Sequence, residues 1–546
     1  MDFIKANANF LDDTNQLLHN AGVLFEKRID ILLELLRGTF VSAPMSVRQP
    51  LRDRLARMSV STSELFQTVF MFYGSKILKR EFDQFYTPIT IGEFLCGLCQ
   101  PSKRIIDPAC GTGDLVVQYS GDTTLWDISQ DVTSLAGQNY AFQGKYATIA
   151  TKDSIRASSD GNGTYDYAIV NPPFGTKTLV TDPEVLAAYT LGAGKKKQEL
   201  GILFVERSMN LLKPDGVLFV ILPNGYFGNT TSPYVELRSY LLQYRILAVL
   251  KLPQNTFKRS GTGVSTNILI VSKSTPPPDY DIFIEEVADI GYELNKKNTP
   301  FKYRKTSAEY AVDTAGRPIR QNDLPGVLDR LRTFASRNGV SSLRAPETSD
   351  TSYQVVKASA LGPGHILDIS RYLTSYTGVV ANTTGKVSIR SLLQPTYSCA
   401  FQKDTTREYI YLDIKEINTP LHNGKKLQGH ELPSRAKYQL KQHDILVSRL
   451  KGSVAFTVIL EDKDNLVCTN GVCVLRPNDT DAMRTLFAGL FSPEFKIQHA
   501  SLTTGSIMES ISDEDIKEIK ISAEIDTHKY QRILDSIAVL QTELPE

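Results

Sequence analysis

The amino-acid sequence predicts an α/β protein with a doubly wound, mostly parallel sheet, preceded by helices and followed by an α+β region. Three observations lead to this prediction. Between residues 100 and 275, short apolar runs such as RIIDPA and NILIVSK alternate with helical patterns, as buried parallel strands alternate with crossover helices. A proline-rich break follows at Pro276–Pro278. Beyond about residue 353, short strand-like runs separated by turns replace the alternation.

The composition suits a protein of several domains. The 546 residues include 61 Lys or Arg and 60 Asp or Glu, which gives a net charge of +1. A near-neutral chain has no overall attraction to nucleic acid or membranes, although a local basic patch can be hidden in that average. No apolar run is long enough for a transmembrane helix, and the first residues lack the pattern of a secretory signal. We therefore expect a cytoplasmic protein without membrane contact.

Shifts in composition divide the chain into five segments. Residues 1–80 are predicted to form a helical domain, because apolar residues recur at three- and four-residue steps. Residues 81–275 are the α/β domain, 276–352 an extension and a polar linker, and 353–526 the α+β region. Residues 527–546 are predicted to form a final helix. The apolar residues that share one face of that helix are Tyr530, Ile533, Leu534, Ile537 and Leu540.

The cysteines do not indicate a metal site. Cys96 and Cys99 form a C-x-x-C motif that has no second pair and lies in the apolar stretch IGEFLCGLC. Small buried residues of a helix account for this pattern better than zinc or redox chemistry. We expect no metal.

A glycine-containing loop follows the first strand of the α/β domain. It consists of Asp107, Pro108, Ala109, Cys110, Gly111, Thr112 and Gly113. A strand, a glycine turn and a helix N-terminus present backbone N–H groups to a ligand at the carboxyl end of the strand. The next strand ends in Asp127, where a carboxylate can accept hydrogen bonds from ribose hydroxyls. A third strand ends near Asp153, which offers a further carboxylate where an adenine amino group would lie.

A rigid tetrapeptide follows the strand YAIV. It consists of Asn171, Pro172, Pro173 and Phe174. Two consecutive prolines fix φ twice, and the residue before them is held in an extended conformation. The Asn171 side-chain oxygen and the Pro172 carbonyl can therefore point into one small space and hold a planar NH₂ group, with Phe174 stacked on the attached ring. Such a site positions an amine that is too weakly basic to attack unaided.

These motifs, in this order, resemble those of S-adenosylmethionine-dependent DNA methyltransferases that act on the N6 amine of adenine. Within that group, residues 1–335 are most similar to the modification subunits of type I restriction systems. The resemblance implies a Rossmann-like methyltransferase sheet, with S-adenosyl-L-methionine bound by the glycine loop, Asp127 and Asp153. The segment QFYTP resembles the family segment that lines the methionine end of the cofactor. Its residues are Tyr86, Thr87 and Pro88.

The resemblance also implies how the reaction proceeds. The target adenine is flipped out of duplex DNA, because its amino group is unreachable while the base is paired and stacked. Asn171 and Pro172 bind the N6 amine, Phe174 stacks on the base, and Phe257 is the expected second aromatic wall. Neither a metal nor a general base is required, since the proton can leave after attack.

The charge is unevenly distributed in the C-terminal region. Residues 353–451 have a net charge of +7 and residues 452–546 a net charge of −8. The basic part could therefore contact DNA phosphates. The residues expected to do so are Lys425, Lys426, Arg435, Lys437, Lys441, Arg449 and Lys451.

One part of this region is similar to the specificity subunits of type I systems. The segment HDILVSRLKG at 443–452 resembles a strand-turn element of their target recognition domains, and the final helix resembles their spacer helix. One copy is present where a specificity subunit has two. We therefore expect double-stranded DNA as the partner and a homodimer formed through the 527–542 helix, which would match a near-symmetric target. Restriction (nuclease or translocase) and specificity subunits are further expected partners.

Three alternatives remain at this point. Asn-Pro-Pro-aromatic motifs also serve methyltransferases that act on RNA or on protein glutamine, against which the recognition-like region argues. A fused restriction nuclease would need an Asp…Glu-x-Lys block, and the sequence contains no convincing one. A non-catalytic DNA-specificity module would not need the intact glycine loop and tetrapeptide.

Overall fold

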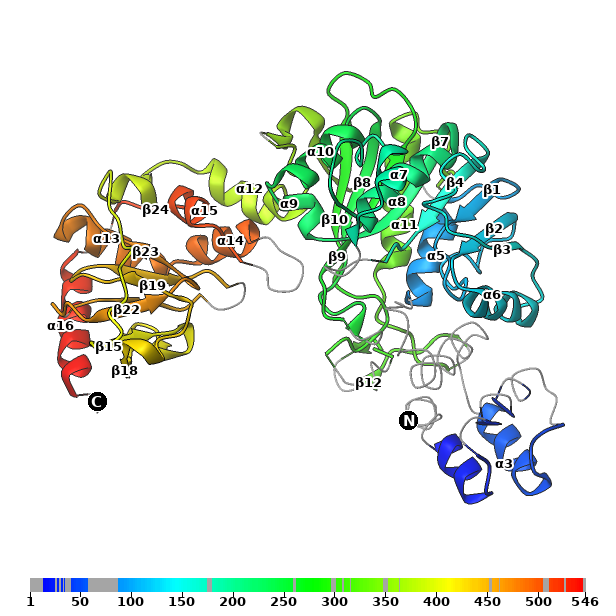
Figure 1. Ribbon diagram of the computed structural model, residues 1–546, viewed down its shortest axis with the longest axis horizontal. Helices are drawn as coiled ribbons and strands as arrows, with labels where there is room; N and C mark the ends of the chain where they lie inside the picture. The colour runs from blue at the N-terminus through cyan, green and yellow to red at the C-terminus, as the bar shows by residue number, and fades with distance from the viewer. Residues whose placement is uncertain are drawn as a thin grey trace. The chain divides into compact units, whose positions relative to one another are not determined.

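The structure is a computed structural model. It describes residues 13–24, 27–28, 31–32, 34, 41–56, 87–173, 179–258, 262–295, 301–306, 309–314, 316–346, 352–362, 364–450, 454–460, 462–503, 510–524 and 527–543. The chain forms two compact units, residues 1–369 and residues 370–546 (Figure 1). After the roles that the sequence leads us to expect, we call them the catalytic unit and the recognition unit, and we describe each by itself.

The catalytic unit contains a nine-stranded sheet of order β13-β10-β8-β9-β7-β4-β1-β2-β3. Its strands are β1 (Arg104–Asp107), β2 (Asp122–Asp127), β3 (Thr148–Thr151), β4 (Tyr165–Val170), β7 (Leu212–Pro223), β8 (Arg245–Lys251), β9 (Thr266–Ser272), β10 (Asp281–Glu286) and β13 (Gln354–Lys357). All of these strands run in one direction except β9 and the edge strand β13, which are antiparallel to their neighbours. The prediction of a doubly wound α/β sheet is confirmed.

The central strands are buried on both faces, as their continuous apolar runs predict. Ile105 and Ile169 belong to an apolar cluster that also contains side chains of α5 (Ile89–Leu98), α6 (Gln130–Phe142) and α11 (Leu324–Arg337). Ile106 and Ala168 alternate with them along the strands and are also fully buried. The helix α8 (Leu200–Leu211) packs on β4 and β7.

The segment after Pro278 belongs to the catalytic unit. The helix α11 packs on α5, where the Arg332 guanidinium donates to the Gly97 carbonyl at 2.5 Å. Strand β13 pairs with β10 at the edge of the large sheet. The recognition unit therefore starts at residue 370, later than the expected boundary at 353, because residues 354–357 find their backbone partners on the catalytic sheet. Cys96 and Cys99 are buried, and no metal-ligand cluster occurs in the described parts of the chain.

Only part of the predicted N-terminal helical domain falls within the described residues. Residues 13–20 are helical, and α3 spans Met45–Ala56. The helix expected around residues 64–78 lies outside the described residues. Among the residues that are described, no helix is long and apolar enough to span a membrane.

The recognition unit is α+β, as predicted. A four-stranded sheet contains β18 (Lys425–Gln428), β15 (Glu408–Leu412), β22 (Leu466–Thr469) and β19 (Ala436–Gln439), in that order. A three-stranded sheet contains β21 (Phe456–Val458), β20 (Ile445–Ser448) and β23 (Val472–Leu475). The remaining larger elements are β14 (Lys386–Ser388), β24 (Lys520–Ser522), α12 (Thr374–Ala381), α13 (Thr480–Leu490), α14 (Pro493–Leu502), α15 (Asp513–Glu518) and α16 (Thr527–Glu543).

The C-terminal helix α16 packs on α13 of its own chain. Leu534 and Ile537 are buried in an apolar cluster with α13 residues, and the Arg484 guanidinium donates to Gln531 Oε1 at 2.6 Å. Leu540 is 49% exposed. Most of the apolar face that the sequence suggested for dimerisation is therefore covered within the chain.

Candidate active site

The predicted site residues of the catalytic unit gather at one edge of the sheet. Strands β1, β2, β3 and β4 are parallel, so their carboxyl ends lie at the same edge (Figure 1). Asp107 and Asp127 are the last residues of β1 and β2, Asp153 follows β3, and Asn171 follows β4. Parallel open sheets bind ligands at this edge, at the point where the strand order reverses. Here the order reverses between β1 and β4.

The glycine loop after β1 is tied to the end of β2. The Gly111 N–H donates to Asp127 Oδ2 at 3.0 Å, and the Ser129 N–H donates to Asp127 Oδ1 at 3.0 Å. Gly111 and Gly113 have φ values of +54° and +78°, which favour glycine. At Gly113 an added Cβ would lie 3.0 Å from the Tyr140 ring. The two glycines therefore let the loop turn tightly while Asp127 is held in a fixed orientation.

Burial perturbs both carboxylates. Asp107 is 1% exposed, and its Oδ1 accepts a hydrogen bond from the Ala109 N–H at 3.0 Å. Burial is the main reason that the pKa of Asp107 is raised to about 8, and the nearby Asp127 charge contributes in the same direction. The pKa of Asp127 is also raised, chiefly by burial. The edge is therefore suited to receive positive charge, which would favour the ionised forms of both groups.

Asp153 lies at the same edge but organises a turn. Its Oδ1 accepts from the Ile155 and Arg156 N–H groups at 3.0 and 3.1 Å. The adjacent Ser154 hydroxyl donates to the Pro108 carbonyl at 2.5 Å, which links this turn to the glycine loop. The other Asp153 oxygen lies 3.7 Å from Arg156 in a partly exposed ion pair.

Asn171 has one satisfied group and one free acceptor. Its amide nitrogen donates to the Thr87 hydroxyl at 3.0 Å, immediately before α5. Its Oδ1 is buried and has no hydrogen-bond partner among the described residues. Buried polar atoms are rarely left unpaired without a functional reason. The bond to Thr87 fixes the amide so that this oxygen is available to an incoming donor.

Only some of the other predicted residues of this site fall within the described parts of the chain. Pro172 is buried and Pro173 half-buried after β4. Phe174 and Tyr86 lie outside the described residues. Phe257 is fully buried in the apolar cluster of the unit, so it has a packing role, and its stacking on a base stays a prediction.

The sequence analysis missed Ile128. This residue follows Asp127 directly and is 64% exposed, although it is large and apolar. An exposed isoleucine beside a ribose-type carboxylate offers a flat ligand an apolar contact. The signal was present in the sequence as an apolar residue directly after the acidic end of a strand.

Three of the basic residues predicted to contact DNA in the recognition unit are paired with acidic neighbours. Lys425 pairs with Glu416 at 3.1 Å, and Arg435 pairs with Asp413 and donates to the Tyr411 hydroxyl at 3.2 Å. Four lysines of the set are exposed, namely Lys425, Lys426, Lys437 and Lys441. Lys451 lies outside the described residues.

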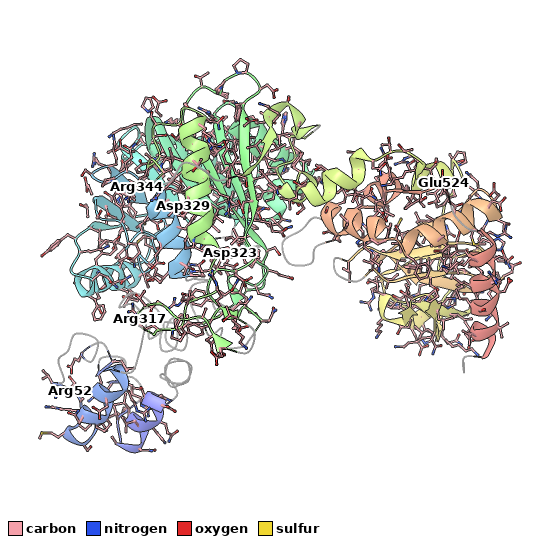
Figure 2. All side chains as sticks on the ribbon, turned by 180° about the vertical axis from the view of Figure 1, so that it is seen from behind. Arg52, Arg317, Asp323, Asp329, Arg344 and Glu524 are labelled. Carbon is pink, nitrogen blue, oxygen red and sulfur yellow. The ribbon has the colours of Figure 1, made fainter. Side chains whose placement is uncertain are left out.

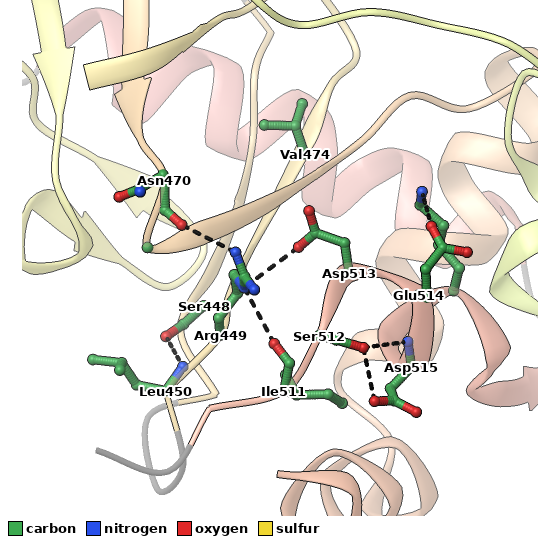
Figure 3. A network of polar contacts seen from close by, with 12 residues as sticks. Ser448, Arg449, Leu450, Asn470, Val474, Ile511, Ser512, Asp513, Glu514 and Asp515 are labelled. Carbon is green, nitrogen blue, oxygen red and sulfur yellow. Dashed lines mark hydrogen bonds and ion pairs between the residues drawn. The ribbon is translucent and has the colours of Figure 1, made fainter. Parts of the chain in front are cut away.

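Arg449 is the most strongly held of these residues. Figure 3 shows its guanidinium between the Asn470 carbonyl at 3.3 Å, the Ile511 carbonyl at 3.2 Å and Asp513 at 3.4 Å. Its backbone N–H also donates to the Gly471 carbonyl at 3.1 Å. Arg449, which follows β20, therefore links that strand by hydrogen bonds to the β22–β23 turn and to the segment around the start of α15.

Comparisons with known proteins agree with the geometry of the catalytic unit. Residues 69–315 match the family model described as N-6 DNA Methylase. The Type I restriction enzyme EcoEI methylase subunit of Escherichia coli is 24% identical over 251 residues, which cover 41% of this chain and 49% of that protein. The Type II methyltransferase M.VspI of Vibrio sp. is 27% identical over 193 residues, covering 32% and 45% of the two chains. This chain thus matches about half the length of these relatives.

A solved structure resembles the chain over most of its length. The type IIG restriction endonuclease BpuSI is 12% identical with a TM-score of 0.49, and the match covers 98% of this chain and 72% of that one. The family match and the site at the carboxyl ends of β1, β2 and β4 lie within the same segment. The chain therefore contains an N-6 DNA methylase domain across residues 69–315.

Proposed function

We propose that the protein is a site-specific DNA methyltransferase that flips a target adenine out of the duplex and methylates its N6 amine. The buried, unpartnered Oδ1 of Asn171 is the observation that carries this proposal. An acceptor held in place by Thr87 and followed by two prolines suits an aromatic amine. The relatives are type I and type II methylases, which supports a role in a restriction–modification or phage-defence system.

The residues present fit S-adenosyl-L-methionine as the cofactor. Asp127 would accept the ribose hydroxyls, because each of its oxygens has one hydrogen bond from the backbone and a further lone pair. The exposed Ile128 would contact the adenine ring. Asp107, Thr87 and the turn of Gly111 would surround the methionine end. When bound, the cofactor supplies an electrophilic methyl group on a sulfonium sulfur.

The chain's own residues would position the amine. Asn171 Oδ1 and the Pro172 carbonyl would accept the two N6 hydrogens, which aims the nitrogen lone pair away from them. Phe174 would stack on the flipped base, with Phe257 behind it. The proton released after attack needs no dedicated base, because the N-methylated product cation is strongly acidic.

Two candidate partners follow with less support. Specificity and restriction subunits would be expected if the chain works as its type I relatives do. A homodimer through α16 would have to use the exposed Val539 and Leu540, because Leu534 and Ile537 are covered by α13. Double-stranded DNA is the substrate in either case.

Transfer of a tritiated methyl group from S-adenosylmethionine tests the proposal. Duplex DNA from a source that lacks the modification should become labelled, and hydrolysis should release N6-methyladenine. Labelling of RNA or of protein glutamine instead would favour the alternative methyltransferases. Binding of DNA without any transfer would favour a non-catalytic specificity module.

The raised pKa of Asp107 predicts that cofactor binding releases a proton. With a pKa of about 8, this carboxyl is mostly protonated at pH 7 in the cofactor-free protein. The cationic cofactor should favour the ionised form and lower the pKa, so binding should release up to about one proton at pH 7 and tighten as pH rises toward 8. Calorimetry in buffers of different ionisation heat measures this proton.

The Asp107→Asn variant is the control for that measurement, because asparagine keeps the shape and cannot titrate. The proton count of the wild type minus that of the variant belongs to Asp107 alone. Equal counts in the two proteins would show that Asp107 is already ionised or lies away from the cofactor charge.

A further inference from the structure

The extension contains a small antiparallel module that the proposed function does not use. We call residues 290–322 the basic module; its described residues include β11 (Lys305–Thr306) and β12 (Glu309–Tyr310), which pair with each other. In the sequence, seven Lys or Arg and three Asp or Glu give this segment a net charge of +4, against +1 for the whole chain; Lys296 and Lys297 of this count lie outside the described residues. The near-neutral total charge of the chain therefore hides a local positive charge in the catalytic unit, besides the one found in residues 353–451.

The basic module starts at the catalytic edge of the sheet. Strand β10 runs parallel to β8, and β7 parallel to β4, with the antiparallel β9 between β7 and β8, so the chain leaves β10 at the edge that carries Asn171. In Figure 1 the module projects from one end of the sheet, where β12 is labelled, and Figure 2 labels Arg317 on it and Asp323 at its base. Asp323 Oδ2 accepts from the Asp289 N–H at 2.8 Å, which closes the base.

Two hydrogen bonds connect the module to the candidate active site. The Thr90 hydroxyl donates to the Ile290 carbonyl at 2.9 Å, and Thr90 lies three residues after Thr87, which holds Asn171. The Asn255 amide donates to Asn295 Oδ1 at 3.1 Å. The base of the module is therefore bonded to the start of α5, three residues from the Thr87 that holds Asn171, so we expect a duplex whose adenine reaches Asn171 to run near it.

A row of aromatic rings forms the body of the module. Ring centroids lie 5.4 Å apart for Tyr292 and Phe301, 6.4 Å for Phe301 and Tyr303, and 6.2 Å for Tyr303 and Tyr310. Arg320 lies over the Phe301 ring at 3.8 Å. The rings pack against one another and against Arg320 and Lys305. These contacts stabilise the fold of the module.

The outer cations of the module are available to a ligand. Arg304, Lys305 and Arg317 are exposed. Arg317 pairs with Asp313 at 2.9 Å, whereas Arg304 and Lys305 form no ion pair with any described residue. Lys305 lies 5.2 Å from the Tyr310 ring centroid. In the recognition unit, three of the cations predicted to contact DNA, Lys425, Arg435 and Arg449, are instead paired with carboxylates.

We propose that the basic module binds the phosphate backbone of duplex DNA beside the target adenine, through Arg304 and Lys305. The proposal rests on the proposed function for the identity of the substrate. Exposed cations with no acidic partner among the described residues, on a firm platform next to the catalytic edge, are complementary to phosphates. Phosphate contacts fix the position of a duplex without reading its sequence, so the module would position DNA for flipping.

The test compares two double variants that each remove one Arg and one Lys from adjacent positions. Arg304→Gln/Lys305→Gln changes the module. Lys103→Gln/Arg104→Gln is the control for charge at the opposite edge of the sheet, where exposed Lys103 precedes β1 and exposed Arg104 begins it, paired with Asp122 at 3.1 Å. Binding of a fluorescent random-sequence duplex of about 30 bp is measured between about 50 and 200 mM salt.

The module variant should bind more weakly, on the order of tenfold, and the slope of log affinity against log salt should become shallower by about 0.9 for each phosphate that the variant no longer neutralises. The control variant should match the wild type. Exchanging the two residues, as Arg304→Lys/Lys305→Arg, keeps both charges and should restore the slope. Thermal unfolding at the wild-type temperature would show that the module variant is folded.

Equal slopes for the module variant, the control and the wild type would overturn the proposal, and so would a wild type that binds no duplex. This readout does not depend on methyl transfer. A protein that shows the slope difference but transfers no methyl group would contradict the proposed function and leave the DNA-binding module standing. If transfer occurs, the module variant should raise KM for DNA and keep kcat at saturating DNA.

Discussion

Replacing Asn171 with alanine is expected to abolish methyl transfer to DNA while leaving the fold and the binding of DNA intact. The side chain is the one polar side chain of the tetrapeptide, and its buried Oδ1 has no partner among the described residues. Removing it leaves only the Pro172 carbonyl to accept from the amine, which no longer fixes the direction of the nitrogen lone pair. Because no described residue bonds to that oxygen, the fold gives up only the 3.0 Å bond to Thr87.

The loss should be at least about 10³-fold in the single-turnover rate. Removing one preorganised polar group that acts in the transition state costs about 10²–10³, and here the same group also sets the angle of attack. The rate is measured with tritiated cofactor at saturating DNA. DNA affinity, measured separately, should stay within about twofold of the wild type, since phosphate contacts supply most of it.

Two further variants make this expectation specific. Asn338→Ala removes another half-buried asparagine, whose amide donates to the Phe334 carbonyl at 2.9 Å at the far end of α11. It should transfer methyl groups as the wild type does. Thr87→Val keeps the shape of Thr87 but removes the hydroxyl that orients Asn171, so it should lower the rate by about tenfold. Full activity in Asn171→Ala would refute the assigned role of the tetrapeptide.

The candidate active site could be predicted from sequence because each of its parts is local. A strand, its terminal carboxylate and the glycine turn after it are contiguous, and parallel strands bring their carboxyl ends together whatever the rest of the chain does. Asp107, Asp127 and Asn171 therefore lie where their positions in the sequence predict. The contact between Thr87 and Asn171 joins distant segments, and the sequence did not predict it; the family resemblance placed Thr87 only at the methionine end of the cofactor.

The surface charges could not be predicted in the same way, because their partners are far away in the sequence. Arg449 meets Asp513, and Arg435 meets Asp413, only once the recognition unit has folded. A count of basic residues treats both as free cations. For the same reason, the sequence did not predict that β13 pairs with β10, because the two strands lie on opposite sides of the linker.

The second large effect is expected in the interior of the recognition unit. Arg476 and Asp444 form a bidentate pair, with the guanidinium Nε and Nη2 each 2.8 Å from a carboxylate oxygen. Asp444 is fully buried and Arg476 is 8% exposed. The Lys441 N–H also donates to Asp444 Oδ2 at 2.8 Å. The carboxylate thus joins the start of β20 to the end of β23.

Arg476→Met should lower the free energy of unfolding of the recognition unit by about 3–5 kcal/mol, because it leaves a buried carboxylate without its counter-charge. Hydrogen exchange of β20 and β23 in the full chain measures this loss without separating the units. Arg390→Met is the matched control in the same unit. Arg390 pairs with Glu514 and Glu518 at 2.6 Å but is 48% exposed, so its loss should leave the stability of the unit nearly unchanged.

A double variant distinguishes the charge from the packing. Asp444→Asn/Arg476→Met removes both charges and keeps an acceptor for the Lys441 N–H. It should be more stable than Arg476→Met by at least about 2 kcal/mol, because the penalty in the single variant comes from the unpaired charge. If the double variant were as unstable as the single one, the loss would come from packing of the arginine stem against Tyr397, whose ring lies 5.5 Å from the guanidinium. In that case the pair would stabilise the unit by packing alone, and its charges would not contribute to holding β20 and β23 together.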